Sequence, residues 1–226
     1  MAAFDIEPDL KQTQQNKLFS TVILPFFLAC ALFFPLFVFQ DLGFLDFWWW
    51  ISLNIVILVS FGLLFDSSYR DYLKRDFQSG SGKKIVLGVL SAVFLYGIFY
   101  AAGEFSRIIF HFAEGSIDSI YSLKQGSSLL KIMFLMTLVI GPGEELFWRG
   151  FLQRNWERRF GKYSGFLLCV LMYAFVHLGS GNVILVLAAA VCGLFWGGLF
   201  LWKRSVLLVA VSHAVWDVLI FLIFPL

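Results

Sequence analysis

Long apolar runs, separated by short polar stretches, dominate the chain and predict a bundle of membrane-spanning helices. The runs are continuous rather than alternating, which is typical of spanning helices and not of the strands of a membrane barrel. A helix needs about 20 apolar residues to cross the hydrocarbon core of a bilayer. Seven runs have roughly this length, at residues 18–39, 44–65, 85–102, 129–152, 164–179, 183–202 and 206–224.

Two features of this pattern affect individual helices. The sequence Gly141-Pro142-Gly143 interrupts the fourth run. Proline lacks the backbone N–H that donates to the preceding turn, so we expect a kink or break there. The polar stretch before the first run contains both acidic and basic residues, unlike the basic leader of a cleavable signal, and we expect an uncleaved first span.

Two segments between the runs are less apolar. In residues 103–128, Phe105, Ile108, Ile109 and Phe112 have helical spacing, which fits a helix lying on the outer membrane surface. A polar loop with a short cap fits this segment equally well. Residues 66–84 are expected to form the main inner loop, with a flexible Ser-Gly tip at residues 79–82.

The composition agrees with a polytopic all-α membrane protein. Of the 226 residues, 60% are hydrophobic and 14% are charged, whereas soluble domains have about 45–50% apolar and about 25% charged residues. The mean hydropathy of +0.83 excludes an ordinary soluble domain, a disordered tail and a nucleic-acid-binding module. Cys30, Cys169 and Cys192 lie in apolar runs without a CxxC pair, and we expect small core residues rather than a disulfide or thiolate site.

The distribution of basic residues predicts the orientation. If the chain crosses seven times, 13 of the 17 Lys and Arg residues fall on one side, in residues 11–17, 70–84, 154–162 and 203–204. Loops rich in Lys and Arg stay in the cytoplasm. We therefore expect a multi-pass protein of the plasma membrane with its amino terminus inside and its carboxyl terminus outside. Trp48, Trp49, Trp50 and Trp202 lie near run ends, as interfacial aromatic belts do.

Ionisable residues within the predicted spans gather in the second half of the chain. The first three runs contain almost none, whereas the later runs contain Glu144, Glu145, Arg149, His177, His213 and Asp217. Such residues usually face a cavity or a partner. This asymmetry predicts an amino-terminal scaffold of three spans plus an interfacial segment, residues 1–128, and a functional four-helix unit, residues 129–226.

Spacing suggests which of these side chains meet. Glu145 and Arg149 are four residues apart and can pair on one helix face, whereas Glu144 is rotated by roughly 100°. Glu144 lies 17 residues before Gly161 and His177 lies 16 residues after it. If the chain reverses at Gly161, the two side chains lie at one level of adjacent antiparallel helices.

The last run brings two more groups to the same depth. His213 and Asp217 are also four residues apart and share a helix face. Each histidine alone is commonly a hydrogen-bonded core residue, and His213 with Asp217 could be a structural pair. Two histidines and an acid converging on Glu144 instead favour a functional site.

Three short motifs resemble those of the CPBP family, which includes CAAX prenyl endopeptidases and bacteriocin-processing or self-immunity proteins. Residues 144–149 (EELFWR) fit the motif EExxxR, residues 173–177 (YAFVH) resemble FxxxH, and residues 213–217 (HAVWD) resemble HxxxN. The resemblance covers residues 129–217. The stretch GLFWG at residues 193–197 resembles the glycine-rich helix expected between the second and third motifs, and its bare faces permit close packing.

The resemblance implies an endopeptidase that hydrolyses a peptide bond inside the membrane. Glu144 would act on a water molecule as general base and then as acid. His177 would hold or help to activate this water, and His213 would face the oxyanion. Arg149 would neutralise and orient Glu145.

Two residues depart from the family pattern. Tyr173 replaces the usual Phe, and its hydroxyl must find a partner. Asp217 replaces the usual Asn. Because an ionised carboxylate only accepts hydrogen bonds, Asp217 is expected to orient His213 as a charged donor, or else to be protonated itself.

The cofactor, the partners and two other functions stay open at this point. We expect no cofactor, with zinc held by His177, His213, Asp217 and Glu144 as the alternative. The expected partners are the lipid bilayer and a membrane-associated protein or peptide with a CAAX-type end, leader or carboxyl-terminal signal; nucleic acid is not expected. A non-catalytic self-immunity or partner-binding protein of the same fold remains possible, as does a proton-coupled transporter, although repeat symmetry is lacking.

Overall fold

The computed structural model describes residues 19–226, and every regular element in this part of the chain is a helix. The start of the first predicted run at residue 18, and the basic residues 11–17 that oriented the amino terminus, lie outside the described residues. The all-α polytopic fold predicted from the hydrophobic pattern is therefore confirmed.

Six helical segments between residues 19 and 226 are long and apolar enough to cross a membrane. They correspond to six of the seven predicted runs. Three of them include a wide π-helical or tight 3-10 turn at one end. The six are η1 (Phe19–Ile23) with α2 (Leu24–Phe39); α3 (Phe47–Phe65); α5 (Ser81–Ile109); α10 (Lys162–Val176) with η4 (His177–Ser180); α11 (Val183–Lys203); and α12 (Val206–Val218) with η5 (Leu219–Ile223).

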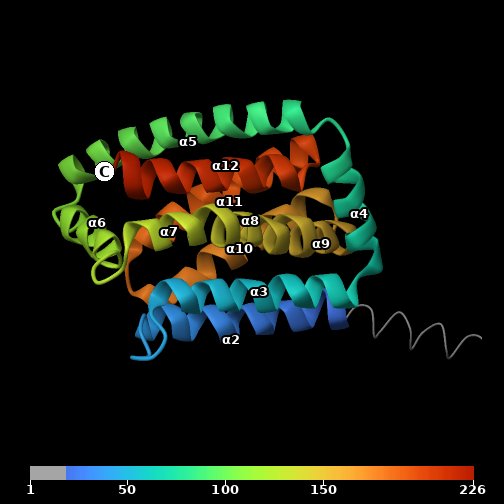
Figure 1. Ribbon diagram of the computed structural model, residues 1–226, viewed down its shortest axis with the longest axis horizontal. Helices are drawn as coiled ribbons and strands as arrows, with labels where there is room; N and C mark the ends of the chain where they lie inside the picture. The colour runs from blue at the N-terminus through green and yellow to red at the C-terminus, as the bar shows by residue number, and fades with distance from the viewer. Residues whose placement is uncertain (1–18) are drawn as a thin grey trace, which may run out of the picture.

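The remaining predicted run forms a helical column through the centre of the bundle (Figure 1). We call residues 129–160 the central column. It consists of α7 (Leu129–Leu135), η2 (Met136–Ile140), α8 (Gly141–Glu145), η3 (Leu146–Gln153) and α9 (Arg154–Phe160). Helices α3, α10, α11 and α12 pack around it. Glu144, Glu145 and Arg149 of the column are therefore enclosed by protein rather than exposed to acyl chains.

Of the kink or break expected at Pro142, the break does not occur, because the central column continues through this residue as a helix. The backbone stays helical at Ile140 (φ −71°, ψ −66°) and Gly141 (φ −56°, ψ −52°). In the wide turn before the proline, the Gly141 N–H donates to the Met136 carbonyl, five residues earlier. Such π-turns accommodate a residue that cannot take part in regular α-helical bonding.

Two glycines let neighbouring helices approach the column closely. A Cβ atom on Gly143 would lie 2.3 Å from Ile55 Cγ2 of α3. A Cβ atom on Gly141 would lie 3.1 Å from both the Ala214 backbone nitrogen and Asp217 Oδ2 of α12. These glycines therefore bring α3 and α12 against the segment that carries Glu144.

The two segments between the runs differ from expectation. Residues 66–84 are not a loop, because they contain the amphipathic helix α4 (Ser67–Gln78), whose buried Tyr69 contacts the central column. The third span also extends beyond residue 102 to Ile109, and exposed Phe105 and Ile108 lie on this extension. The separate helix in this region is the short α6 (Ala113–Ser122).

The basic loops lie together at one end of the bundle. Arg154 Nη2 donates to the Ser68 carbonyl at 2.8 Å, and the Tyr72 hydroxyl donates to the Arg204 carbonyl at 2.7 Å. We call this the basic end; it includes α4 and the α9–α10 turn. Helix α6 and the carboxyl terminus lie at the opposite end, which we call the α6 end (Figure 1).

Candidate active site

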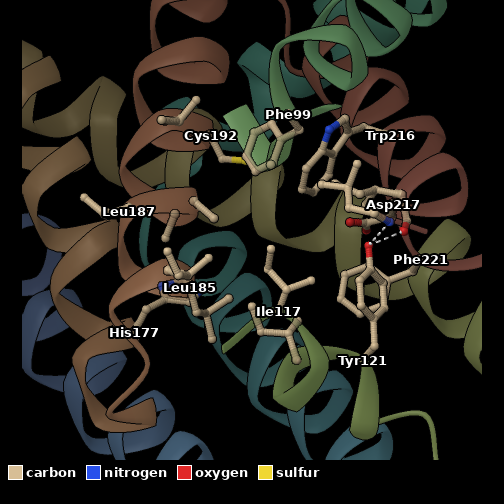
Figure 2. A pocket seen from close by; sticks show the side chains of 18 of the residues that line it. Phe99, Ile117, Tyr121, His177, Leu185, Leu187, Cys192, Trp216, Asp217 and Phe221 are labelled. Atoms are coloured by element: carbon tan, nitrogen blue, oxygen red, sulfur yellow. Dashed lines mark hydrogen bonds between the residues drawn. The ribbon is translucent and has the colours of Figure 1, made fainter. Parts of the chain in front are cut away.

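A cavity of about 410 Å³ extends from the middle of the bundle to the α6 end. Most of its wall consists of aliphatic and aromatic side chains from α5, α6, α11 and α12 (Figure 2). Polar groups are concentrated in the part nearest the central column, where Glu144, Tyr173, His177, His213 and Asp217 line it. The cavity therefore contains all four residues expected to be catalytic.

The chain reversal that brings these residues together occurs where the sequence predicted it. Helix α9 ends at Phe160, Gly161 has a φ of 91°, and α10 begins at Lys162. A Cβ atom on Gly165 would lie 2.2 Å from the Glu157 backbone nitrogen, so α9 and α10 cross almost in backbone contact. The close antiparallel pair places Tyr173 and His177 beside Glu144.

Glu144 is held by a hydrogen bond from the neighbouring helix. The Tyr173 hydroxyl donates to Glu144 Oε2 at 2.6 Å, and the glutamate is only 5% exposed. This is the partner that the additional hydroxyl of Tyr173 required. Oε2 is thus fixed, and Glu144 presents its carboxylate at the inner part of the cavity.

Glu145 has a different set of partners. Its Oε1 accepts a hydrogen bond from Arg149 Nη1 at 3.0 Å and another from His213 Nδ1 at 2.8 Å. The Arg149 guanidinium also lies over the rings of Tyr173 and Trp196, 4.8 Å and 5.8 Å from their centroids. Glu145 therefore joins the central column to α12 and compensates the buried charge of Arg149.

The His213 ring is fixed on two sides. It stacks on the Trp196 indole with 3.7 Å between ring centroids, and Trp196 Nε1 donates to Ser212 Oγ at 3.1 Å. Nδ1 is used by Glu145, so Nε2 faces Asp217 Oδ1 at 3.6 Å, beyond hydrogen-bond distance. The hydrogen bond that orients His213 is thus the one that its Nδ1 donates to Glu145 Oε1, and not, as expected, one to Asp217.

His177 has one ring nitrogen free for chemistry. Its Nδ1 lies 2.7 Å from the Tyr173 carbonyl oxygen, which can only accept, so Nδ1 carries the proton. Nε2 is then the acceptor nitrogen. The ring lies against Phe37, with 4.6 Å between centroids. Tyr173 therefore positions two groups, Glu144 through its hydroxyl and His177 through its carbonyl.

The zinc alternative finds no preformed ligand group. Within residues 19–226, no three His, Cys, Asp or Glu side chains are arranged to hold a metal ion. His213 Nδ1 is engaged by Glu145, which leaves Nε2 as the nitrogen open to a ligand, and Asp217 Oδ2 has no hydrogen-bond partner in the described part of the chain. Zinc therefore stays the alternative that the chelator experiment tests.

Sequence reasoning missed two contributors to the site. Trp196 was considered only as part of a glycine-rich packing stretch, yet it supports His213. Trp48 was expected at the membrane interface, but it is buried, lines the cavity and donates from Nε1 to the Leu123 carbonyl. Trp48 is the second residue of α3, directly after the N-cap Asp46, and this position was the signal in the sequence that it belongs to the helix.

The expected packing role of the glycine-rich stretch is confirmed. A Cβ atom on Gly193 would lie 3.3 Å from Val170 Cγ1, and one on Gly197 would lie 2.8 Å from Phe166 Cε2. Helix α11 therefore packs closely on α10. The three cysteines are free, and Cys169 and Cys192 are buried, as expected for core residues.

The comparison with protein families agrees with the motifs. Residues 126–219 match the family model described as Rce1-like, type II CAAX prenyl endopeptidase Rce1-like. The comparisons with curated proteins and with solved structures found no match. The matched segment contains the central column and all three motifs. Residues 126–219, a little less than half of this membrane protein, are therefore similar to the Rce1-like endopeptidases, which is consistent with the resemblance of the three motifs to the CPBP family.

Proposed function

We propose that the protein is an intramembrane endopeptidase that hydrolyses a peptide bond of a membrane-associated protein or peptide. The observation that carries this proposal is the shared cavity, in which Glu144, His177, His213 and Asp217 come from three different helical segments. A purely structural ion pair would account for Glu145 and Arg149 but not for the remaining polar groups facing a cavity.

The proposed reaction starts with a water molecule between Glu144 and His177. Glu144 takes one proton from the water while the resulting hydroxide attacks the carbonyl carbon of the substrate. His177 Nε2 accepts a hydrogen bond from the same water, because its Nδ1 is occupied by the Tyr173 carbonyl. Glu144 then passes its proton to the leaving nitrogen, and the C–N bond breaks.

His213 is placed to stabilise the tetrahedral intermediate. In its doubly protonated form it donates from Nδ1 to Glu145 and from Nε2 to the oxyanion. Asp217, whose Oδ1 lies 3.6 Å from Nε2, would favour this charged form of the ring when it is ionised. An aspartate is thereby compatible with a position that is usually asparagine in the family.

We further propose that the basic end faces the cytoplasm and that the protein resides in the plasma membrane. The support is the clustering of basic residues on α4, the α9–α10 turn and the α11–α12 turn. The α6 end then faces the outside.

The proposal is tested with purified protein in liposomes that contain a membrane-embedded reporter peptide. We expect Glu144→Gln to lower cleavage by about a hundredfold or more, because the general base is lost. Glu104→Gln is the matched control, since Glu104 is an exposed residue that pairs with Arg107 and does not itself line the cavity. Both variants are compared with the wild type for folding by thermal unfolding.

The same assay separates the alternatives. Cleavage that is unchanged in a folded Glu144→Gln variant would contradict the protease proposal, and solute flux lost in this variant would favour a transporter. A chelator should leave cleavage unchanged if no metal takes part, whereas loss of cleavage that zinc restores would favour a metalloprotease.

A further inference from the structure

The cavity continues from the candidate catalytic groups to the lipid-facing surface of the bundle. Its wall includes Ile98 and Phe105 of α5 and Leu187 and Val191 of α11. These side chains are exposed, with 62% for Phe105 and 53% for Leu187. Helix α5 packs along α12 and α11 packs along α10, so the two helices flank an opening rather than packing on each other.

Two contacts limit the opening along the membrane normal. Toward the basic end, the rings of Phe94 of α5 and Phe195 of α11 stack with 6.2 Å between centroids. At the other end, Ile117 and Tyr121 of α6 line the cavity (Figure 2). Tyr121 anchors α6, because its hydroxyl donates to the Ile220 carbonyl at 2.8 Å.

The opening lies in the half of the bundle that faces away from the basic loops. On α11 the lining begins at Ile184, close to α6, and ends at Trp196 beside His213. At 1.5 Å per residue this span is about 18 Å long. An extended peptide rises about 3.3 Å per residue. The cavity therefore has room along its length for roughly five extended residues.

We propose that the substrate is an apolar, unwound end of a membrane-spanning protein segment, and that it enters sideways between α5 and α11 from the outer half of the bilayer. This proposal rests on the proposed function. The opening is continuous with the candidate catalytic groups, so its occupant is the substrate. The apolar wall excludes charged side chains, which would lose their hydration without finding a partner.

Unwinding is required by the chemistry of the substrate. In a helix within lipid, each backbone carbonyl is engaged in an intrahelical hydrogen bond. Water can attack only a carbonyl that has been released and turned toward Glu144. An extended segment satisfies this requirement, whereas a helix does not.

The entrance is tested with two single-span reporters that carry the same apolar segment, either in the outer or in the cytoplasmic half of the bilayer. Each is coproduced in bacterial cells with wild type, Glu144→Gln, Leu187→Trp or Leu194→Trp. Leu187 lines the opening; Leu194 lies two turns further along α11, is 49% exposed and does not line the cavity. The two Trp variants thus make the same chemical change on one helix.

We expect cleavage of the outer-half reporter only. Leu187→Trp should lower cleavage of the outer-half reporter by about tenfold or more, because the larger side chain narrows a hydrophobic site. Leu194→Trp should cleave this reporter at close to the wild-type rate. Cleavage of only the cytoplasmic-half reporter would overturn the proposal. If cleavage requires Glu144 but is the same in both Trp variants, the proposed entry between α5 and α11 is wrong. The proposed protease function would still hold. If wild type cleaves neither reporter, the entrance is overturned, and the liposome assay alone decides the protease function.

Discussion

Glu144 and Glu145 are consecutive in the chain, yet their partners differ. Glu144 accepts from a neutral hydroxyl at 2.6 Å, whereas Glu145 accepts from Arg149 and His213 at 3.0 Å and 2.8 Å. A carboxylate held between two basic groups is suited to fixing geometry. A carboxylate that is held by a single hydroxyl and faces a cavity is free to exchange a proton. The difference predicts opposite effects of the same substitution.

Glu145→Gln should destabilise the protein, whereas Glu144→Gln should remove activity and leave the fold. Glutamine at position 145 leaves the guanidinium of Arg149 buried without its counter-charge, which typically costs about 3–5 kcal/mol. The loss of stability in Glu145→Gln is measured by thermal unfolding in detergent and by the amount of protein in the membrane. Equal stability of the two variants would show that Glu145 has no special role in the packing.

Tyr173→Phe should lower kcat by about tenfold, because this factor corresponds to the loss of one hydrogen bond to a charged group. KM should change less. The phenyl ring preserves the packing against Trp148, so the fold should persist. Tyr163→Phe is the control, because Tyr163 is 67% exposed at the start of α10, away from the cavity. Equal kcat in both variants would contradict a positioning role for the Tyr173 hydroxyl.

At the scale of helices, the close approach of α3 to the central column determines where Glu144 lies. Gly143→Ala would place its Cβ 2.3 Å from Ile55 Cγ2, inside a buried contact. We expect a loss of about 1–3 kcal/mol, as for other overpacked cores. Ile55→Ala in the same chain should recover part of it, because it removes the clashing atom.

Gly97→Ala serves as the control for this pair. A Cβ atom at Gly97 meets nothing within 4 Å, and the residue lies inside α5. Alanine there should leave stability unchanged or raise it slightly through its helix propensity. Destabilisation of Gly97→Ala and Gly143→Ala by the same amount would point to a general effect of glycine replacement instead of a clash with α3.

The helices that the sequence predicted best are those with long apolar runs and clear ends. The reversal at Gly161 used in the depth counting occurs, and Tyr173, one turn before His177, donates to Glu144; only helix rise and one reversal were needed for this expectation. Helix α4 was missed because its buried Tyr69 lies among charged residues and gives no long apolar run. The hydrogen bond from His213 to Glu145 depends on the rotation of α12 about its axis, which spacing alone does not fix.

The division into a scaffold, residues 1–128, and a catalytic unit, residues 129–226, stays a prediction. The Rce1-like match begins close to the predicted boundary, at residue 126. Yet the cavity also receives Phe37, Trp48 and Phe99 from α2, α3 and α5. On the scale of the whole molecule, the first three spans therefore shape the cavity that contains the candidate catalytic residues.

The basic end should be sensitive to acid. Asp66, between α3 and α4, is buried, which raises its pKa, but hydrogen bonds from Ser68 and Asn155 and the charge of Arg154 outweigh this and lower the pKa below its ordinary value of 3.8. Its stabilising contribution is present above that value and is lost as the pH falls through the lowered pKa. Asp66→Asn should thus lower thermal stability at pH 7, with a difference from wild type that shrinks below pH 4. A constant difference would contradict this assignment.

The orientation of the whole molecule decides from which side a substrate reaches the cavity. Gln78, beside the α4–α5 turn, and Gln125, between α6 and α7, are both exposed and lie at opposite ends of the bundle. We expect a membrane-impermeant maleimide on intact cells to label Gln125→Cys but not Gln78→Cys, with Cys30, Cys169 and Cys192 replaced by alanine. Permeabilised cells should label both, which controls for reactivity. The reverse pattern would place the basic end outside, against the energetic preference of Lys and Arg for the cytoplasmic side, and the cavity would then open toward the cytoplasmic half of the bilayer.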